Sequence, residues 1–311
     1  MSNDKRIILT GATGMIGARL FPALCERGYQ VVIFSRSPDS ARAKLPGAAA
    51  YVRWWPGESG SWVKAVDGAH AVIHLAGAPI TQGLIGVRWT PAYKTEILNS
   101  RVVGTRGIVN AIAAATNRPS VLINASAIGF YGYSDSTPLD ETAQSGEDFV
   151  AQICVAWERE ASRAEASGVR VVRLRTGIVL DPNSGALSQL KGPFKMGTGG
   201  PIMPGTQFYS WIHPADEVGL ILLALEDERV SGALNATAPT PHTNRDFCSI
   251  LGQVLSSPAW LPVPEFGVRV ALGEMADLVV RGQRVLPKRA LELGYSFKYP
   301  TLKPALKDLL K

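Results

Sequence analysis

Three glycines near the start of the chain constrain its fold more than any other feature. They lie in Gly11-Ala12-Thr13-Gly14-Met15-Ile16-Gly17, between an apolar run at Lys5–Thr10 and an amphipathic stretch at Met15–Arg27. After a strand and before a helix, the first glycine permits a tight turn, the second lets backbone approach a diphosphate, and the third allows close helix packing. The segment therefore predicts a dinucleotide-binding loop at the helix start, where free N–H groups attract anions. The predicted contacts are Thr10, Gly11, Thr13, Gly14, Met15, Ile16 and Gly17. An ordinary glycine turn is the alternative.

Short apolar runs alternate with amphipathic stretches through the first half of the chain. The runs are nearly continuous in apolar character, as strands buried on both faces should be. They are Lys5–Thr10, Gln30–Ser35, Ala49–Trp54, Ala71–Leu75, Ser120–Ser126 and Val169–Thr176. Helical patterns lie between them at Met15–Arg27, Ser61–Val66, Ala92–Thr116 and Phe149–Ser167. This alternation predicts an α/β fold with a doubly wound parallel sheet.

The composition changes after residue 177. Asp181–Gly205 is rich in glycine and proline, so we expect a loop-rich segment that lines a site. Helices are predicted at Pro214–Glu226 and Asn244–Leu255, a loop at Pro258–Pro264, and a mostly helical final fifty residues. We therefore expect a nucleotide-binding domain over residues 1–180, with later strand contributions from 207–236, and a smaller lid domain over 181–311 on the substrate side.

The charge and the cysteines limit the partners and the compartment. The net charge of +6 suggests nucleic-acid binding at first, but the basic residues form no run of five or more. We expect no nucleic-acid partner, and we assign part of the excess to an anionic small molecule. Cys25, Cys154 and Cys248 are far apart and lack metal-ligand spacing, which favours a reduced, cytoplasmic chain without a metal. Since no stretch reaches ~18 apolar residues, we expect no membrane partner. Monomer and homodimer both stay open.

The end of the second predicted strand bears on cofactor choice. NAD sites carry Asp or Glu there to accept hydrogen bonds from the ribose, whereas this chain has Ser35 and Arg36. An arginine suits a 2′-phosphate, and the serine adds a hydroxyl donor. The pattern predicts NADP(H) over NAD(H), with a solvated surface charge as the alternative for Arg36. Further cofactor contacts are expected from small residues after the fourth strand and from the helix beyond it, at Leu75, Ala76, Gly77 and Arg101.

Four motifs resemble the extended short-chain dehydrogenase/reductase group over nearly the whole chain. They are GATGMIG at 11–17, HLAGAP at 74–79, ASAIGFYG at 125–132 and RLRTGIVL at 173–180. More narrowly, the chain resembles the atypical YfcH-type, NAD-dependent epimerase/dehydratase-like family. The supporting residues are Arg88-Trp89, Trp157-Glu158, Gly199-Gly200-Pro201, Ser210–His213, Asp216 and the tail at Arg284–Arg289. The resemblance implies a Rossmann-type NADP(H) domain with a small C-terminal lid.

The acid/base pair usual in that group is missing from its expected helix. Typical members carry a Ser or Thr and then Tyr-x-x-x-Lys, in which the Lys lowers the pKa of the catalytic Tyr and holds the ribose. Residues 149–158 contain neither Tyr nor Lys. The remaining catalytic candidates are Ser126, which is also a predicted cofactor contact, and Tyr131. A packing role beside the nicotinamide is the alternative for Tyr131.

The substrate side is expected at residues beyond the strand ends and in the lid. These are Arg88, Arg175, Gly200, Trp211 and His213. An ion-pair role is the alternative for Arg175, and capping of the helix that begins at Pro214 is the alternative for His213.

Two functions fit these patterns. One is an NADP(H)-dependent, epimerase-like oxidoreductase acting on an unknown small substrate, such as a sugar nucleotide or a carbonyl compound. The other is a non-catalytic protein that senses NADP(H), with a link to cell division because some relatives carry that label. The glycine loop with Ser35 and Arg36 makes the first the leading hypothesis, and the missing Tyr and Lys motivate the second.

Overall fold

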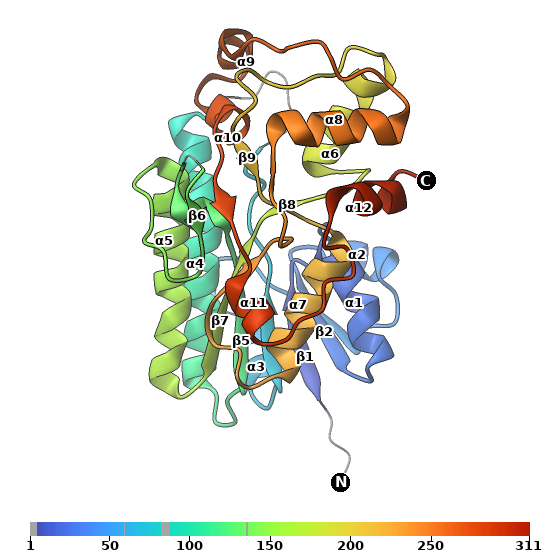
Figure 1. Ribbon diagram of the computed structural model, residues 1–311. Helices are drawn as coiled ribbons and strands as arrows, with labels where there is room; N and C mark the ends of the chain where they lie inside the picture. The colour runs from blue at the N-terminus through green and yellow to red at the C-terminus, as the bar shows by residue number, and fades with distance from the viewer. Residues whose placement is uncertain (1–4, 59, 82–87, 135) are drawn as a thin grey trace.

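A seven-stranded parallel sheet forms the centre of the molecule (Figure 1). The computed structural model describes residues 5–58, 60–81, 88–134 and 136–311. All neighbouring strands of this sheet pair in parallel. Their order across the sheet is β11 (Gly232–Ala236), β7 (Arg170–Thr176), β5 (Val121–Ala127), β4 (Ala71–His74), β1 (Arg6–Thr10), β2 (Gln30–Ser35) and β3 (Ala50–Arg53). The order reverses on either side of β1, and ligands of doubly wound sheets bind at such a point.

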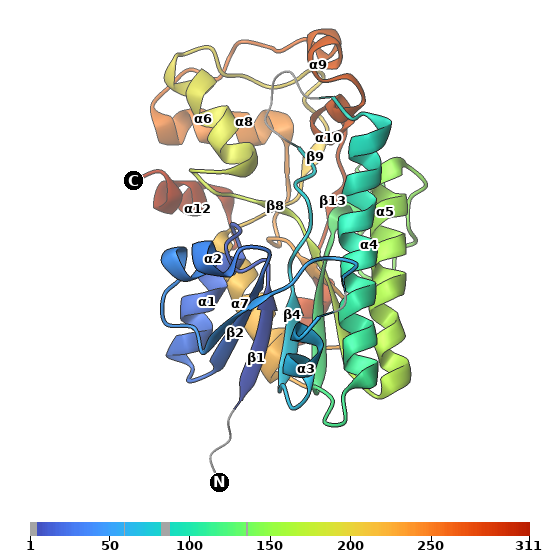
Figure 2. The same cartoon turned by 180° about the vertical axis from the view of Figure 1, so that it is seen from behind.

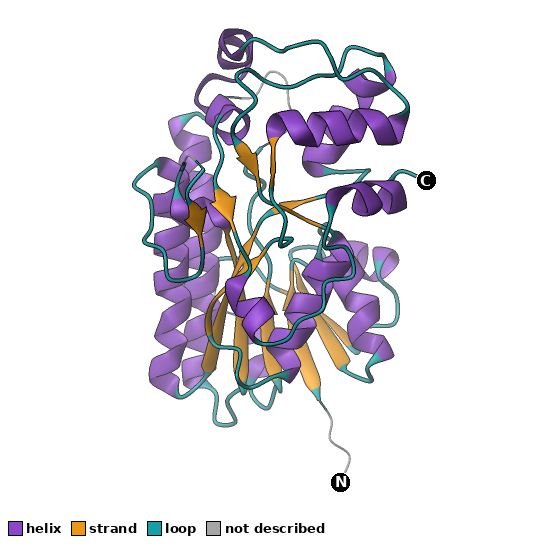
Figure 3. Cartoon of the chain, in the orientation of Figure 1, coloured by secondary structure: helices purple, strands orange, loops and turns teal. Residues whose placement is uncertain are grey.

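Helices cover both faces of the sheet (Figures 2 and 3). One face carries α1 (Gly17–Glu26), α2 (Pro38–Lys44) and α7 (Pro214–Glu226), and the other carries α3 (Trp62–Val66), α4 (Pro91–Ala114) and α5 (Phe149–Ser162). Alternation along β1 separates the two cores: Ile7 and Leu9 join the first, and Ile8 joins the second. Burial of the strands on both faces accounts for their continuous apolar character.

The doubly wound Rossmann-type fold predicted from the sequence is confirmed. The six predicted strands are present with ends within one residue, and α7 and α8 (Asn244–Leu255) have the predicted bounds. Two details differ. The helix predicted over Phe149–Ser167 changes to a 3₁₀ helix at Arg163–Ser167, and Gly168 follows with a φ of 75°, which favours glycine. Helix α2 has no counterpart in the prediction.

A smaller, mostly helical layer lies beyond the carboxyl ends of the strands, at the top of Figure 1. It contains α6 (Gly185–Lys195), α8, α9 (Glu265–Leu272), α10 (Asp277–Val280) and α12 (Leu302–Leu309). Helix α6 lies inside the segment predicted to be loop-rich. Burial of Leu187 and Phe194 against α8 and α12 stabilises it despite Pro193 in its last turn.

The later part of the chain returns repeatedly to the sheet. Helix α7 and strand β11 belong to the sheet layer, and α11 (Lys288–Glu292) packs on β11. Three short pairs of strands lie along these crossings: β8 (Ile178–Val179) with β10 (Trp211–Ile212), β9 (Phe208–Tyr209) with β12 (His242–Thr243), and β6 (Pro138–Leu139) with β13 (Arg284–Val285). The domain boundary at residue 180 stays a prediction.

Two features bear on the partners predicted from the sequence. Among the described helices, none is both long and apolar enough to cross a membrane. Cys25, Cys154 and Cys248 are all free thiols, and Cys154 and Cys248 are buried.

Candidate cofactor site

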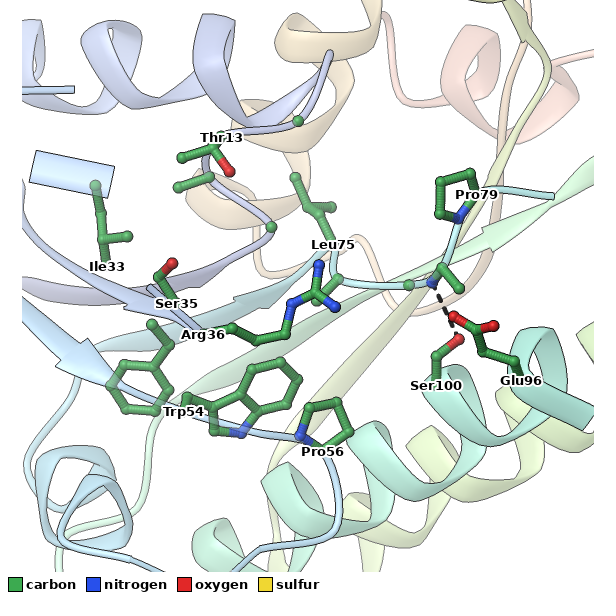
Figure 4. A pocket seen from close by; sticks show the side chains of 17 residues that line it. Thr13, Ile33, Ser35, Arg36, Trp54, Pro56, Leu75, Pro79, Glu96 and Ser100 are labelled. Carbon is green, nitrogen blue, oxygen red and sulfur yellow. Dashed lines mark hydrogen bonds between the residues drawn. The ribbon is translucent and has the colours of Figure 1, made fainter. Parts of the chain in front are cut away.

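A cavity of about 440 Å³ opens at the carboxyl ends of β1, β2 and β4. Figure 4 shows Arg36 extending into it beside Trp54, with Ser100 and Glu96 at the opposite end. The wall comprises residues from the glycine loop, the ends of β2, β3 and β4, and the first turns of α4. They are Gly11, Ala12, Thr13, Gly14, Ile33, Phe34, Ser35, Arg36, Trp54, Pro56, Leu75, Ala76, Gly77, Ala78, Pro79, Glu96 and Ser100.

The glycines of the loop are required by close backbone approach. Gly11 has a φ of +69°, and a Cβ there would lie 2.8 Å from the carbonyl carbon of Leu75. A Cβ on Gly17 would lie 2.3 Å from the carbonyl oxygen of Gly11. The Gly14 N–H donates to that same oxygen at 3.0 Å and closes the turn. The predicted roles of Gly11 in the turn and Gly17 in close packing thus match the geometry.

Thr10 supports the loop from below the cavity. Its hydroxyl lies 2.7 Å from Nδ1 of His74 and accepts a hydrogen bond from the Ala76 N–H at 3.2 Å. His74 is fully buried, and this burial lowers its pKa to about 3, so the imidazole is neutral. Thr10 therefore joins the end of β1 to the end of β4 and does not line the cavity. Met15, Ile16 and Gly17 lie outside the lining as well.

The far end of β2 forms a basic and aromatic wall. The Arg36 guanidinium lies over the Trp55 ring, with Cζ 5.5 Å from the ring centroid. The Ser35 hydroxyl accepts a hydrogen bond from the Ser37 N–H at 3.1 Å, which holds the chain in a turn there. The two residues directly after β2, Arg36 and Ser37, carry no carboxylate, and the single acidic residue in the lining, Glu96, belongs to α4.

Sequence reasoning missed part of this wall. Trp54 and Pro56 follow β3, and Glu96 and Ser100 lie on α4. The Ser100 hydroxyl accepts a hydrogen bond from the Ala78 N–H at 3.0 Å and so fixes the segment after β4. The Trp-Trp-Pro run at 54–56 was an available signal for an aromatic wall, because it follows the third strand of a nucleotide-binding sheet.

Ser126 and Tyr131 belong to a buried polar network at the carboxyl ends of β5 and β7. The Ser126 hydroxyl donates to Oε1 of Glu158 at 2.7 Å. Arg175 binds both oxygens of that carboxylate, at 2.8 and 2.9 Å. A third Arg175 N–H donates to the Tyr131 hydroxyl at 2.9 Å, which in turn donates to Asn235 Oδ1 at 2.6 Å. All five side chains are buried.

This network restrains the two predicted catalytic hydroxyls. Burial raises the pKa of Tyr131 to about 12, although the Arg175 guanidinium acts in the opposite direction. The phenol is therefore protonated at neutral pH. Neither hydroxyl lines the cavity beside the glycine loop. A catalytic role for Ser126 or Tyr131 stays a prediction, whereas the ion-pair alternative weighed for Arg175 is what the geometry displays.

Helix α5 faces these strand ends with three side chains one turn apart. Val150 and Cys154 lie against Gly129, where an added Cβ would lie 2.5 Å from Val150 Cγ1 and 3.7 Å from Cys154 Sγ. Glu158 follows one turn later and holds Ser126 and Arg175. This face therefore carries no Tyr and no Lys.

The chain has one Tyr-x-x-x-Lys spacing, Tyr299 to Lys303, and it lies elsewhere. Tyr299 stacks on His213, with ring centroids 3.8 Å apart, and Lys303 donates to Gln253 at 2.9 Å. Both residues belong to the tail around α12, which packs on α8. Tyr299 and Lys303 therefore make structural contacts, with His213 and Gln253, and neither lines the cavity beside the glycine loop.

The residues predicted for the substrate side have protein partners and do not line the cavity. Arg88 donates to the Val270 carbonyl at 2.6 Å, and the fully buried Trp211 donates to Thr240. Gly200 lies against Leu261, whose carbonyl oxygen would be 1.9 Å from an added Cβ. His213 caps α7 by accepting from the Ala215 N–H at 3.1 Å, and burial lowers its pKa. A substrate contact for these four residues stays a prediction.

Comparison with known proteins is consistent with this site. A family model described as the NAD dependent epimerase/dehydratase family matches residues 7–236, and a domain of unknown function (DUF1731) matches residues 263–309. The chain is 41% identical to the epimerase family protein SDR39U1 homolog, chloroplastic, of Arabidopsis thaliana, covering 99% of this chain and 88% of that one. It is 38% identical to the epimerase family protein YfhF of Bacillus subtilis, covering 98% and 97%.

Solved structures of epimerase-like proteins are also similar to this chain. The crystal structure of human epimerase family protein SDR39U1 (isoform 2) with NADPH is 32% identical, has a TM-score of 0.85 and covers 98% of both chains. MoeE5 in complex with UDP-glucose and NAD, at 23% identity and a TM-score of 0.75, shares the fold alone. From the family model and these relatives, the chain belongs to the NAD-dependent epimerase/dehydratase family of the extended short-chain dehydrogenase/reductase group.

Proposed function

We propose that this protein binds NADP(H) in the cavity beside the glycine loop and acts as an epimerase-like oxidoreductase on a small substrate. The observation that carries the cofactor choice is the pairing of Ser35 and Arg36 at the end of β2, where an NAD site would have a carboxylate. The human relative of known structure, whose crystals contain NADPH, supports the same choice.

The residues present fit a dinucleotide. Added Cβ atoms on Gly11 and Gly17 would collide with neighbouring backbone, so the loop provides a bare backbone surface at the start of α1. The loop would hold the pyrophosphate through its N–H groups and the helix dipole. Arg36 and Ser35 would hold the 2′-phosphate, and Trp54 and Pro56 would flank the adenine. When bound, the cofactor supplies or accepts a hydride, and the protein positions it at the strand ends.

A second candidate function is NADP(H) sensing without turnover. The face of α5 with Val150, Cys154 and Glu158 favours it, because this face lacks the Tyr and Lys that handle protons in typical members. Oxidation of NADPH, followed at 340 nm with a panel of carbonyl compounds and sugar nucleotides, separates the two functions. Sustained oxidation would exclude the sensor, and its absence across the panel would favour the sensor.

We also propose the compartment and the partners expected from the sequence. The free thiols favour a reducing compartment such as the cytoplasm, although the Arabidopsis relative is named chloroplastic. The partner is a small-molecule substrate, with no nucleic acid and no membrane, and the protein is a monomer or a homodimer. Among the described residues no cluster could hold a metal ion.

Thermal melting tests the binding proposal. A ligand that binds only the folded state raises Tm with its concentration. NADP⁺ should raise Tm at concentrations at which NAD⁺ has little effect. Equal shifts, or no shift with either nucleotide, would reject the cofactor assignment.

A further inference from the structure

Arg101 on α4 holds an uncompensated charge beside the end of β4. An added Cβ on Gly77 would lie 3.4 Å from its Cζ, and on the other side Cζ lies 5.1 Å from the Trp157 ring of α5. Its Nη1 donates to the Ile97 carbonyl at 3.0 Å. Among the described residues, no carboxylate lies within ion-pair distance of this half-buried guanidinium.

Two other arginines of the sheet layer differ in this respect. Arg175 pairs with Glu158, and Arg106, also on α4, pairs with Glu160 at 3.0 Å. The titratable groups that face Arg101 are the thiol of Cys154 and the phenol of Tyr93, and neither is a carboxylate. Burial lowers the pKa of Arg101, which reflects the cost of keeping this charge away from water. An anionic or polyhydroxylated ligand would offset that cost.

The position of Arg101 relative to the cavity indicates which part of a ligand it faces. Its neighbours Gly77 and Ser100 line the cavity. Figure 4 shows Ser100 at the end opposite Arg36 and Trp54. With the 2′-phosphate at Arg36 and the pyrophosphate at the glycine loop, the remaining sugar of a dinucleotide extends toward Gly77. Arg101 itself is not among the residues that line the cavity, but it lies against Gly77 and so beside this end.

Helix α5 explains why a cation from α4 is needed there. Cys154 occupies the α5 face at the end of β5; burial raises the pKa of its thiol to about 12, and the nearby Arg101 charge opposes this rise. Helices α4 and α5 pack side by side along this face (Figure 2). Arg101 of α4 thus lies beside an α5 face that carries no Lys.

We propose that Arg101 supplies from α4 the cation that Tyr-x-x-x-Lys enzymes carry on the following helix, and that it holds the ribose–phosphate at the nicotinamide end of NADP(H). The inference rests on the proposed function. It assigns to Arg101 a binding role distinct from that of Arg36, because Arg36 would bind the adenosine end of the cofactor and Arg101 the nicotinamide end.

The test measures binding of three ligands by calorimetry to the wild-type protein, R101Q and R106Q. NADPH and 2′-phospho-ADP-ribose contain the second ribose and the pyrophosphate, whereas adenosine 2′,5′-bisphosphate contains only the adenosine end. Hydrogen bonds to charged groups are individually strong. R101Q should therefore lower the affinity for NADPH and for 2′-phospho-ADP-ribose by about tenfold or more, and the affinity for adenosine 2′,5′-bisphosphate by less than about twofold. R106Q, on the same helix but paired with Glu160, should match the wild type.

If R101Q lost the same affinity for all three ligands, or lost affinity for none of them, the inference would be overturned. R101M, which keeps the apolar stem over Trp157, replaces R101Q if circular dichroism shows that R101Q does not fold. Failure of the wild-type protein to bind NADPH would instead reject the proposed function, so the two failures are distinguishable.

Discussion

Arg175, at the end of β7, and Glu158, on α5, form a buried bidentate ion pair with N–O distances of 2.8 and 2.9 Å. The pair joins the sheet to the helix at the edge where a ligand would bind. It also orients Ser126 and Tyr131, since each hydroxyl bonds to one member of the pair. The two charges satisfy each other, so Arg175 is not free to pair with an anionic ligand, whereas Arg36 and Arg101 lie against aromatic rings.

Breaking this pair on one side should destabilise the protein strongly. E158Q leaves the Arg175 charge buried without its counter-charge, which typically costs about 3–5 kcal/mol of unfolding free energy. E160Q is the matched control, because Glu160 bonds to the more exposed Arg106 and Arg163; its cost should stay below about 1 kcal/mol. Urea denaturation measures both. A loss for E158Q no larger than that for E160Q would show that the pair is dispensable.

Removing the Arg36 charge should change cofactor preference without damaging the fold. R36Q should lower the affinity for NADPH by about tenfold, equal to about 1.4 kcal/mol of binding free energy, because the 2′-phosphate loses a charge-assisted partner. Its affinity for NADH should change little. R42Q removes a neighbouring charge that lies over Tyr51, outside the cavity lining, and serves as the control. If R36Q weakened both nucleotides equally, Arg36 would have no contact with the 2′-phosphate.

Adding one carbon to the loop should abolish nucleotide binding. In G17A the new Cβ would meet the Gly11 carbonyl oxygen at 2.3 Å, so the loop or the start of α1 must move. We expect no detectable binding of NADPH and a lower Tm. G192A adds the same carbon where nothing lies within 4 Å, inside α6, and should be neutral or stabilising by up to about 1 kcal/mol. Normal NADPH binding by G17A would contradict the proposed position of the pyrophosphate.

Glu217 should make stability fall with rising pH. The side chain is fully buried near the start of α7, one oxygen accepts from Thr176 at 2.7 Å, and the other has no partner. Burial raises its pKa from 4.5 to about 8, so the folded state holds the proton more tightly than the unfolded chain. Its favourable contribution is therefore present below pH 4.5 and is lost as the pH rises toward 8.

The variant E217Q cannot ionise and should remove this loss. The difference in unfolding free energy between E217Q and the wild type should grow in favour of E217Q between pH 5 and pH 8, and then level off. Chemical denaturation at a series of pH values measures it. A difference that does not change with pH would mean that Glu217 does not titrate in this range.

Tyr131 offers a test of the predicted acid/base role. Y131F removes the hydroxyl that bonds to Arg175 and Asn235 and should cost about 1 kcal/mol of stability. With a substrate identified by NADPH oxidation, an essential acid/base Tyr131 would lower kcat by at least about 100-fold in Y131F. A kcat within a few-fold of the wild type would assign the residue to packing.

The sheet was predictable because its signals are local. Apolar runs such as Val31–Phe34 are buried on both faces, and a strand of that kind needs no tertiary information to recognise. Helix α6 was not predictable, because Gly185 and Pro193 mark it as a loop, and only long-range burial of Leu187 and Phe194 outweighs that preference.

The residues of the site also fall into a group that local sequence predicts and a group that it does not. The contacts of Gly11 and Gly17 follow from spacing, since the motif encodes backbone geometry. The bond between Ser126 and Glu158 joins residues 32 apart, and the one between Tyr131 and Asn235 joins residues 104 apart. No local pattern specifies such pairs, because they depend on how α5 and β11 pack around β7.

Calorimetric titration of the wild-type protein with NADPH and NADH under one set of conditions tests the central claim most directly. The account predicts that NADPH binds at least about tenfold more tightly than NADH, because Arg36 and Ser35 stand where an NAD site has a carboxylate. Equal affinity for the two nucleotides, tighter binding of NADH, or no binding of either would contradict it.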